Sequence, residues 1–205
     1  MLKLNEVIEV EILKFSELSA LEKTLLERAF KVHLKAQAPY SHFQVGCSLA
    51  TTFSTKLFDG CNIENANWSE TGHAEENAIS AAVCELGPCP IKELAVIGAM
   101  SGHALSWPIP ELDWSLDSTI HLIGKLRIPN LSSSCGSCLQ KIAENCFDDT
   151  GLFDPHVPLL VYDVSKKIIF RTSIGNAYPM PFLPQHLGVN YAKDPRVILN
   201  RLRVK

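Results

Sequence analysis

The sequence predicts an α/β protein, a three-layer α/β/α sandwich in which one mixed five-stranded sheet has helices on both faces. Two observations carry this prediction. Segments of helical and strand periodicity follow one another in the order helix, strand, strand, helix, strand, helix, strand, strand. The 205 residues are also 46% hydrophobic, which is enough to build one substantial core.

The overall charge and the distribution of apolar residues argue against several classes of protein. With 19 basic and 22 acidic residues, the chain lacks the basic excess of a dedicated nucleic-acid-binding protein. No apolar stretch approaches the ~18 residues of a membrane span, and acidic residues precede any apolar run of signal-peptide length. We therefore expect a cytoplasmic protein with no nucleic-acid or membrane partner. Its 7 cysteines are then more often ligands or core thiols than disulfides.

The first elements follow from capping and periodicity. Residues 1–18 are expected to form an N-terminal arm, which could include a short strand. Ser19 and Glu22 form a capping-box pattern, and apolar residues recur after it at helical spacing. These signals predict a helix over 19–37 that Pro39 ends.

A hairpin and a polar loop come next. Residues 43–51 and 56–61 are predicted strands, joined across residues 52–55. Residues 62–72 are too polar and irregular for either kind of element, so we expect a loop.

The second half of the chain repeats the alternation of helices and strands. An alanine-rich helix is expected over 73–86, with Thr71 or Gly72 as its N-cap. The apolar run 94–98 predicts a strand that is covered on both faces. The pattern weakens over about 101–134, which we interpret as an insertion whose residues 119–126 form a strand or one or two helical turns.

The remaining elements are one helix and two strands. We expect a helix over 135–146, capped by one of the serines at 132–134, and strands at 159–163 and 167–171. The expected division of the chain is an arm (1–18), a main domain (19–175, with the insertion at about 101–134) and a C-terminal extension (176–205).

The most informative residues are two cysteines, a histidine and a glutamate. Cys135 and Cys138, at i and i+3 of a helix start, lie on one face, where the free amides favour thiolates. His73, at the start of another helix, can meet them, and three N/S ligands with one open position are typical of catalytic zinc. Water at that position becomes a nucleophile near neutral pH. Glu75 can then act as its general acid and base.

The two cysteines and three further candidate site residues, Phe43, Asn62 and Glu64, also have a simpler interpretation. The two cysteines could be a buried pair or a redox dithiol. Asn62 and Glu64 could belong to a network that caps the loop, and Phe43 could be an ordinary core residue.

Several motifs together point to a known family. His73-Ala74-Glu75 and Cys135-Gly136-Ser137-Cys138 match the signature of zinc deaminases, except that Ser134 stands where proline is usual. Residues 39–46 (PYSHFQVG), 60–66 (GCNIENA) and 182–188 (FLPQHLG) extend the match. Over about residues 20–190 the chain therefore resembles the cytidine deaminases that act on nucleosides.

The resemblance implies a role for each matching residue. His73, Cys135 and Cys138 would hold zinc, and Glu75 would protonate N3, take a proton from the activated water and deliver one to the departing amine. Hydroxide would attack C4 of cytidine or deoxycytidine, giving uridine or deoxyuridine and ammonia, a reaction of pyrimidine salvage. The substrate contacts would be Asn62 and Glu64 to the ribose 3′-hydroxyl, Phe43 beside the pyrimidine, the amide of Ala74 to O2 and the carbonyl of Ser133 to the 4-amino group.

The family also implies a homodimer or homotetramer, and this chain departs from the family pattern at several positions. Ser134 replaces a proline, Leu139 stands where arginine is usual, and Leu187 replaces a phenylalanine that can reach the site across a subunit interface. The interval from His73 to Cys135 is longer than usual for the family because of the 101–134 insertion.

Two alternatives come from other functional classes. The first is a deaminase that acts on bases in RNA or DNA, which the acidic balance and the pairing of Asn62 with Glu64 disfavour. The second is a catalytically silent, zinc-containing nucleoside-binding protein. Glu75 discriminates against it, because a structural zinc site does not need this carboxylate.

Overall fold

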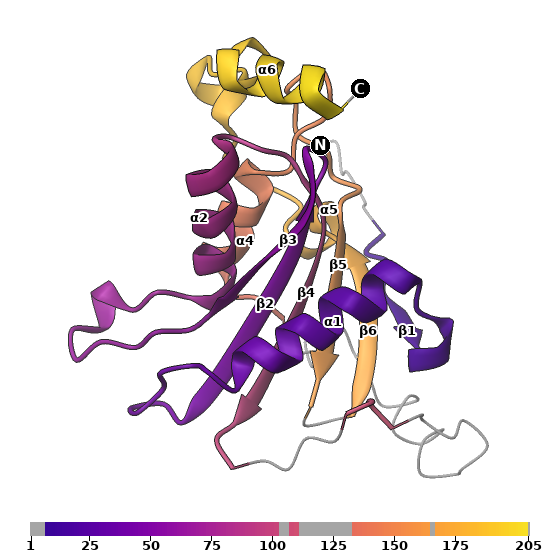
Figure 1. Ribbon diagram of the computed structural model, residues 1–205, viewed down its shortest axis with the longest axis vertical. Helices are drawn as coiled ribbons and strands as arrows, with labels where there is room; N and C mark the ends of the chain where they lie inside the picture. The colour runs from indigo at the N-terminus through magenta and orange to yellow at the C-terminus, as the bar shows by residue number, and fades with distance from the viewer. Residues whose placement is uncertain (1–6, 103–106, 111–132, 165–166, 205) are drawn as a thin grey trace, which may run out of the picture.

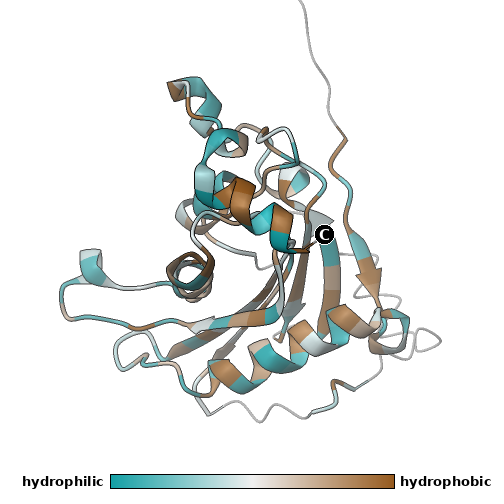
Figure 2. Cartoon of the chain, turned by 45° about the horizontal axis from the view of Figure 1, so that its top comes forward, coloured by the Kyte–Doolittle hydropathy of each residue, from teal (hydrophilic) through white to brown (hydrophobic). Residues whose placement is uncertain are grey.

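The computed structural model describes residues 7–102, 107–110, 133–164 and 167–204. One six-stranded sheet, in the order β1-β6-β5-β4-β2-β3, lies between α1 on one face and α2 and α4 on the other (Figures 1 and 2). The strands are β1 (Glu11–Leu13), β2 (Phe43–Thr51), β3 (Ser54–Cys61), β4 (Ile91–Met100), β5 (Pro158–Asp163) and β6 (Ile168–Ser173). The helices are α1 (Ala20–His33), α2 (Ala74–Leu86), α4 (Gly136–Glu144), α5 (Ile174–Ala177) and α6 (Pro195–Val204).

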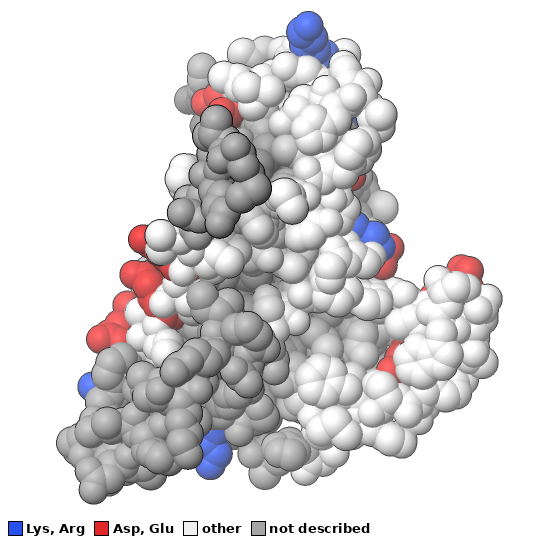
Figure 3. All heavy atoms as spheres, turned by 180° about the vertical axis from the view of Figure 1, so that it is seen from behind, with Lys and Arg blue, Asp and Glu red and all other residues white. Residues whose placement is uncertain are grey.

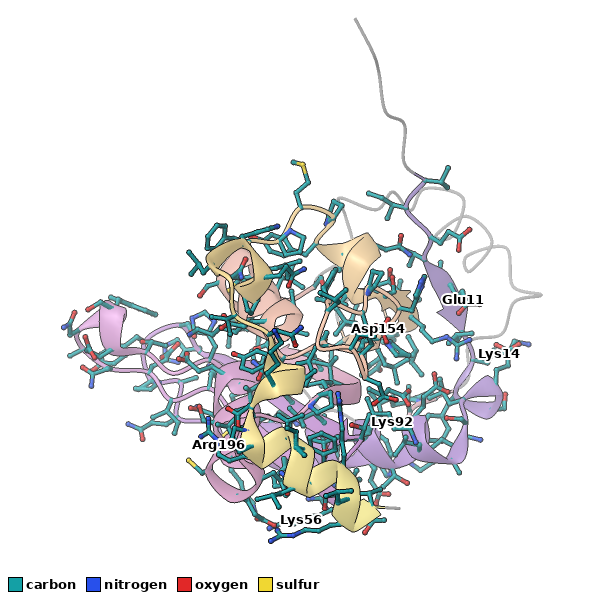
Figure 4. The ribbon with its side chains drawn as sticks, turned by 90° about the horizontal axis from the view of Figure 1, so that it is seen from above. Glu11, Lys14, Lys56, Lys92, Asp154 and Arg196 are labelled. Carbon is teal, nitrogen blue, oxygen red and sulfur yellow. The ribbon has the colours of Figure 1, made fainter. Side chains whose placement is uncertain are left out.

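The predicted sandwich is confirmed, but the sheet has six strands rather than five. The additional strand is β1, which lies in the predicted arm and pairs antiparallel with β6. Glu11 of β1, labelled in Figure 4, also forms an ion pair with Arg171 of β6 at 2.6 Å. A strand of 3 residues has no periodicity to detect, so only its pairing identifies it.

Helix α1 begins as predicted and ends early. The Ser19 hydroxyl accepts from the amide of Glu22, and the Glu22 carboxylate accepts from the amide of Ser19. The helix ends at His33 rather than at residue 37 because the residues after it form hydrogen bonds with the loop at residues 62–64. The amide of Gln37 donates to the carbonyl of Asn62 at 3.0 Å, and the amide of Glu64 donates to the carbonyl of Gln37 at 2.8 Å.

The predicted hairpin is also confirmed, with a turn of only Thr52 and Phe53. Two glycines of this hairpin allow helices to approach the sheet closely. A Cβ on Gly46 would lie 2.2 Å from the Ala29 carbonyl of α1, and a Cβ on Gly60 would lie 2.3 Å from the Ala74 carbonyl of α2. Each helix therefore rests directly on strand backbone.

Strand β4 is covered on both faces, as its apolar run predicts. Leu94 and Val96 belong to the core cluster beneath α2 and α4, whereas Ala95 and Ile97 belong to the cluster beneath α1. β4 pairs parallel with β5 and antiparallel with β2, so the sheet is mixed.

The C-terminal extension contains a helix that the sequence interpretation missed. Helix α6 lies over the C-terminal end of α2 in Figure 1, and its Asn200 side chain donates to the carbonyl of Leu86 at 2.6 Å. Val197 of α6 is fully buried. None of the helices in the described parts of the chain is long and apolar enough to cross a membrane.

Most of the predicted insertion, including the segment 119–126, lies outside the described residues. Of the part that is described, Trp107 packs against rings of the N-terminal region. Its ring centroid lies 5.2 Å from that of Phe30 and 5.5 Å from that of Phe15.

Candidate active site

Helices α2 and α4 pack side by side on one face of the sheet, and the sequence-predicted metal ligands lie at their N-terminal ends. The N-caps are His73 and Cys135, not Thr71 or Gly72 and not a serine before Cys135. Neither side chain caps its own helix. The two side chains instead point to a shared position between the helices.

Three donor atoms converge at this position. Nδ1 of His73 lies 3.5 Å from Sγ of Cys135 and 3.2 Å from Sγ of Cys138. All three ligand atoms lie within 4.8 Å of one another. Zinc bonds of ~2.0 Å to nitrogen and ~2.3 Å to sulfur at tetrahedral angles separate such donors by about 3.5 Å. The donor set and its spacing therefore fit a zinc ion with one open coordination position.

The electrostatics of the site favour a cation there. Cys138 is buried, and an oxygen of the Glu75 carboxylate lies 3.4 Å from its sulfur. Burial, followed by the negative charge of Glu75, raises the pKa of the Cys138 thiol. A thiolate beside a buried carboxylate is costly unless a positive ion compensates for both charges.

Contacts on both sides of α2 hold the donors in place. Lys141 of α4 forms an ion pair with Glu76 of α2 at 2.6 Å. On the other side, the amide group of Asn77 donates to the carbonyl of Cys61, at the end of β3, at 2.8 Å. The first turn of α2 is therefore fixed to both the neighbouring helix and the sheet.

Asn62 follows β3 directly, and its side-chain amide group forms hydrogen bonds with the backbone of β2. Its Oδ1 accepts from the amide of Val45 at 2.7 Å, and its Nδ2 donates to the carbonyl of Phe43 at 2.9 Å. These two bonds fix the orientation of the side chain. The second N–H of Nδ2 has no such partner among the described residues and can donate to a ligand.

The Glu64 carboxylate is also held by backbone hydrogen bonds, through one of its two oxygens. Oε2 accepts from the amides of Tyr40 at 2.9 Å and Ser41 at 3.2 Å. Burial raises the pKa of Glu64, but hydrogen bonds from the Ser41 hydroxyl and from the two amides outweigh it, so the pKa lies below its usual value. Glu64 is therefore charged at neutral pH and can accept with Oε1.

Two hollows meet at His73 and Glu75. The first, which we call the loop pocket, has a volume of about 220 Å³, and Asn62, Glu64 and Ala74 line it. The second, which we call the strand-end cavity, has a volume of about 350 Å³ and lies at the carboxyl ends of β4 and β5. Its lining includes Val96, Met100, Ser133, Ser134, Cys135 and Val164.

Phe43 and Val45 of β2 line both hollows, together with His73 and Glu75. The ring of Phe43 fits against Gly98 of β4, where a Cβ would lie 2.7 Å from its Cζ. All nine sequence-predicted site residues therefore line one of the two hollows or supply the metal donors.

Sequence reasoning missed Trp68. This residue lines the loop pocket beside Glu64, and its ring centroid lies 5.9 Å from that of Tyr40. It belongs to a loop that extends beyond the body of the domain (Figure 1). Trp68 lies between the motifs at residues 60–66 and 73–75, and this position in the sequence could have marked it as a candidate site residue.

The structure also gives a physical setting for the departures at Ser134 and Leu139. Leu139 is buried and lines a small cavity with Ile8 and Val10 of the N-terminal arm, a setting that suits leucine better than arginine. The Oγ of Ser134 is buried and has no hydrogen-bond partner among the described residues. Leu187, in contrast, is 71% exposed.

Residues 19–150 match the family described as "Cytidine and deoxycytidylate deaminase zinc-binding region". The chain belongs to this family. The match spans the donors His73, Cys135 and Cys138, so the cofactor of the site is zinc.

Individual relatives agree with this assignment. A cytidine deaminase of Sporosarcina psychrophila is 33% identical over 122 residues, which are 60% of this chain and 68% of the relative. One from Halalkalibacterium halodurans is 29% identical over 129 residues, which are 63% of this chain and 75% of the relative. The crystal structure of cytidine deaminase from Burkholderia pseudomallei superposes with a TM-score of 0.52 at 26% identity, covering 78% of this chain and 97% of that one.

Proposed function

We propose that this zinc hydrolase deaminates cytidine and deoxycytidine to uridine and deoxyuridine with release of ammonia. The observation that carries the proposal is the placement of Glu75. Its carboxylate is buried beside the three metal donors, and Glu75 also lines the pocket that contains Asn62 and Glu64. A structural zinc site has no use for such a residue.

Under this proposal His73, Cys135 and Cys138 hold the zinc ion through one nitrogen and two sulfurs. Bound zinc supplies an activated water that acts as a nucleophile near neutral pH. Cys138 and Glu75 are buried, and burial strengthens the interactions of their charges.

The loop pocket holds the sugar. Asn62 offers an N–H and Glu64 offers an oxygen, so one ribose hydroxyl can accept from the first and donate to the second. The 3′-hydroxyl satisfies this pair in both ribose and deoxyribose. Both side chains are fixed by backbone hydrogen bonds, which lowers the entropy cost of binding.

The base extends from the sugar toward Glu75. The Phe43 ring flanks the pyrimidine, and the amide of Ala74, a first-turn N–H of α2 without an intrahelical partner, donates to O2. The carbonyl of Ser133 accepts from the 4-amino group. These contacts place C4 at the metal donors.

Glu75 moves the protons. It takes one proton from the attacking water and gives it to N3. It later takes the second proton from the hydroxyl now bound to C4 and delivers it to the amine as the C4–N4 bond breaks. Cytidine and water thus become uridine and ammonia. One carboxylate can serve both steps because each transfer restores it for the next.

The decisive experiment compares the wild-type protein with Glu75→Ala. Wild-type protein that contains about one zinc per chain should consume cytidine. The loss of cytidine absorbance measures this turnover. Glu75→Ala should keep its zinc and lose turnover by at least ~10²–10⁴, the range for one general acid/base step. If the wild-type protein contains zinc but does not convert cytidine, the alternative of a silent nucleoside-binding protein would be favoured. Near-native turnover in Glu75→Ala would refute the role of Glu75.

A nucleic-acid substrate is less well supported than a free nucleoside. The face that carries α2 and α4 shows few Lys or Arg side chains among its described atoms, and acidic side chains gather along one edge (Figure 3). Phosphate contacts need basic side chains. Cytidine should therefore be converted and single-stranded oligonucleotides should not.

We also propose a homo-oligomer in the reducing cytoplasm. Exposed apolar side chains of the C-terminal region, such as Leu187, Leu199 and Leu202, are available for a subunit interface. All seven cysteines are free thiols, which suits a reducing compartment. Light scattering on the purified protein would distinguish a monomer, a dimer and a tetramer.

A further inference from the structure

A further hollow lies outside the active site, between the end of α6, the turn of the β2–β3 hairpin and the start of α1. We call it the α6 groove, and its lining includes Val204 of α6, Thr52 and Phe53 of the turn and Leu21 of α1. Its volume is about 840 Å³, within the range of about 300–1,000 Å³ that is usual for small-molecule sites. None of its lining residues lines the loop pocket or the strand-end cavity. The groove is therefore separate from the active site.

Two basic side chains line the α6 groove without a counter-ion. Lys92, which Figure 4 labels between α6 and α1, and Arg203 form no hydrogen bond or ion pair with any described residue. Arg196 and Arg201, the other arginines of α6, each form an ion pair with an aspartate, at 2.7 Å and 3.6 Å respectively. No acidic residue is among the described residues of the lining. The groove therefore holds two positive charges that have no ion-pair partner in the described chain.

Hydroxyl groups add neutral donors to these charges. Thr51, Thr52, Ser54 and Thr55 all line the groove. Thr51 is only 3% exposed, and its Oγ1 is buried and has no hydrogen-bond partner among the described residues. A buried hydroxyl without a partner is unfavourable, because it has lost its hydrogen bonds to water. An oxygen of a bound anion that reaches this hydroxyl would remove that cost.

The rest of the lining is apolar. It consists of Leu21, Ala50, Phe53, Leu57 and Val204. An inorganic anion would contact the charges and leave this apolar surface in contact with water. A ligand that carries an apolar body beside its anionic group would cover both parts of the lining.

We propose that the α6 groove binds a phosphate monoester that carries an apolar body. A monoester has nearly two negative charges at neutral pH and three terminal oxygens, which match two cations and several hydroxyls. A carboxylate has one charge and two oxygens, and it leaves part of this donor set unused. Arg203 can bind two phosphate oxygens at once through its fork of N–H groups, and Lys92 adds a compact positive charge. The site does not depend on the proposed deamination, because it shares no lining residue with the active site.

The first test measures binding to the whole, zinc-loaded chain by calorimetry in phosphate-free buffer, with 1-naphthyl phosphate as the probe. We expect one molecule per chain, bound at least about tenfold more tightly than inorganic phosphate, which has no apolar body. It should also bind at least about tenfold more tightly than 1-naphthaleneacetate, which has a single charge. Absence of binding would overturn the proposal. Equal affinity for inorganic phosphate would exclude a role for the apolar lining, and equal affinity for 1-naphthaleneacetate would overturn the assignment of a phosphate.

The second test removes the charges of the groove one at a time. Lys92→Gln and Arg203→Gln should each weaken the binding of 1-naphthyl phosphate by at least about tenfold, the effect of one hydrogen bond to a charged group. Both residues are exposed, so these substitutions leave the fold intact. Lys193→Gln is the matched control, because Lys193 is also exposed but does not line the groove. Unchanged affinity in both groove variants, or an equal loss in the control, would overturn the proposal.

The third test separates the groove from the active site. Lys92→Gln should keep the wild-type kcat/KM for cytidine, because Lys92 lines neither hollow of the active site. If 1-naphthyl phosphate competes with cytidine, and Lys92→Gln leaves its inhibition constant unchanged, the ligand binds at the zinc site and the proposal is overturned. The calorimetric tests need no turnover, so they remain decisive even if the protein does not convert cytidine.

Discussion

His73 and Cys135 each occupy the N-cap position of a helix, yet neither side chain accepts a hydrogen bond from its own helix. An N-cap side chain ordinarily satisfies a first-turn amide. Here the side chains turn toward each other, so neither satisfies a first-turn amide of its own helix. The cost of two missing caps is about 1 kcal/mol each, and metal binding offsets it because its free energy adds to the stability of the fold.

A single cysteine substitution tests the metal site. Cys138→Ala should reduce zinc content from about one per chain to near zero, because two remaining ligands do not complete a tetrahedral site. Elemental analysis of the purified variant measures this directly. Cys84→Ala is the control, since Cys84 is an exposed free thiol on α2 and is not one of the three donors. Full zinc occupancy in Cys138→Ala would exclude this sulfur as a ligand.

At the scale of elements, the position of α2 depends on a glycine in β3. A Cβ on Gly60 would lie 2.3 Å from both the carbonyl of Ala74 and the amide of Ala78. The clash is with helix backbone, which cannot move like a flexible side chain. The helix that carries His73 and Glu75 can therefore sit at its observed distance only because residue 60 has no side chain.

Gly60→Ala should destabilise the protein by about 1–3 kcal/mol, the usual cost of overpacking, and should lower turnover because α2 shifts. Denaturant unfolding provides the measurement. Gly136→Ala is the comparison, since a Cβ there meets nothing within 4 Å and alanine favours the helix. Equal stability of the two variants would show that the close approach of α2 is not constrained as described.

The half-buried carboxyl group of Glu93 in β4 makes the stability of the folded protein depend on pH. Burial, followed by the charge of Glu22, raises the pKa of Glu93 to about 7, although Arg171 and Lys92 oppose the shift. The folded protein therefore holds this proton more tightly than the unfolded chain, in which the pKa is about 4.3. The contribution is fully present below the unfolded pKa and is lost as the pH rises toward 7.

Glu93→Gln should remove this dependence. Relative to the wild type, the variant should gain stability between pH 5 and pH 8 by on the order of 1–2 kcal/mol, once partial exposure to solvent is allowed for. Unfolding by urea at several pH values measures the difference. A difference that stays constant over this range would show that Glu93 titrates normally.

At the scale of the whole molecule, the C-terminal extension returns to cover the end of α2. Val197 is fully buried on α6, and the guanidinium group of Arg201 donates to the carbonyls of Asp148 and Asp149. In Figure 4, Arg196 marks the start of this helix above the sheet. The division into an arm, a catalytic domain and an extension remains a prediction, although α6 packs on the main domain.

Two neighbouring residues of α6 test this packing. Val197→Ala should cost about 1–3 kcal/mol, because it removes two buried methyl groups and leaves a cavity. Ile198→Ala should change stability by less than about 0.5 kcal/mol, since Ile198 is 46% exposed. Thermal unfolding compares the two variants. Equal effects would mean that α6 does not pack through Val197 in solution.

The local features of this protein follow from its sequence alone. The capping box at Ser19, the apolar run of β4, the hairpin and the residues of the metal and substrate motifs all depend on short-range patterns. Tertiary structure decided the features that depend on distant partners. Helix α1 ends early because Gln37 pairs with the loop at residues 62–64, and β1 exists as a strand because β6 binds it. The strand-end cavity arises where β2, β4, β5 and the segment before α4 meet, and no local pattern encodes that meeting.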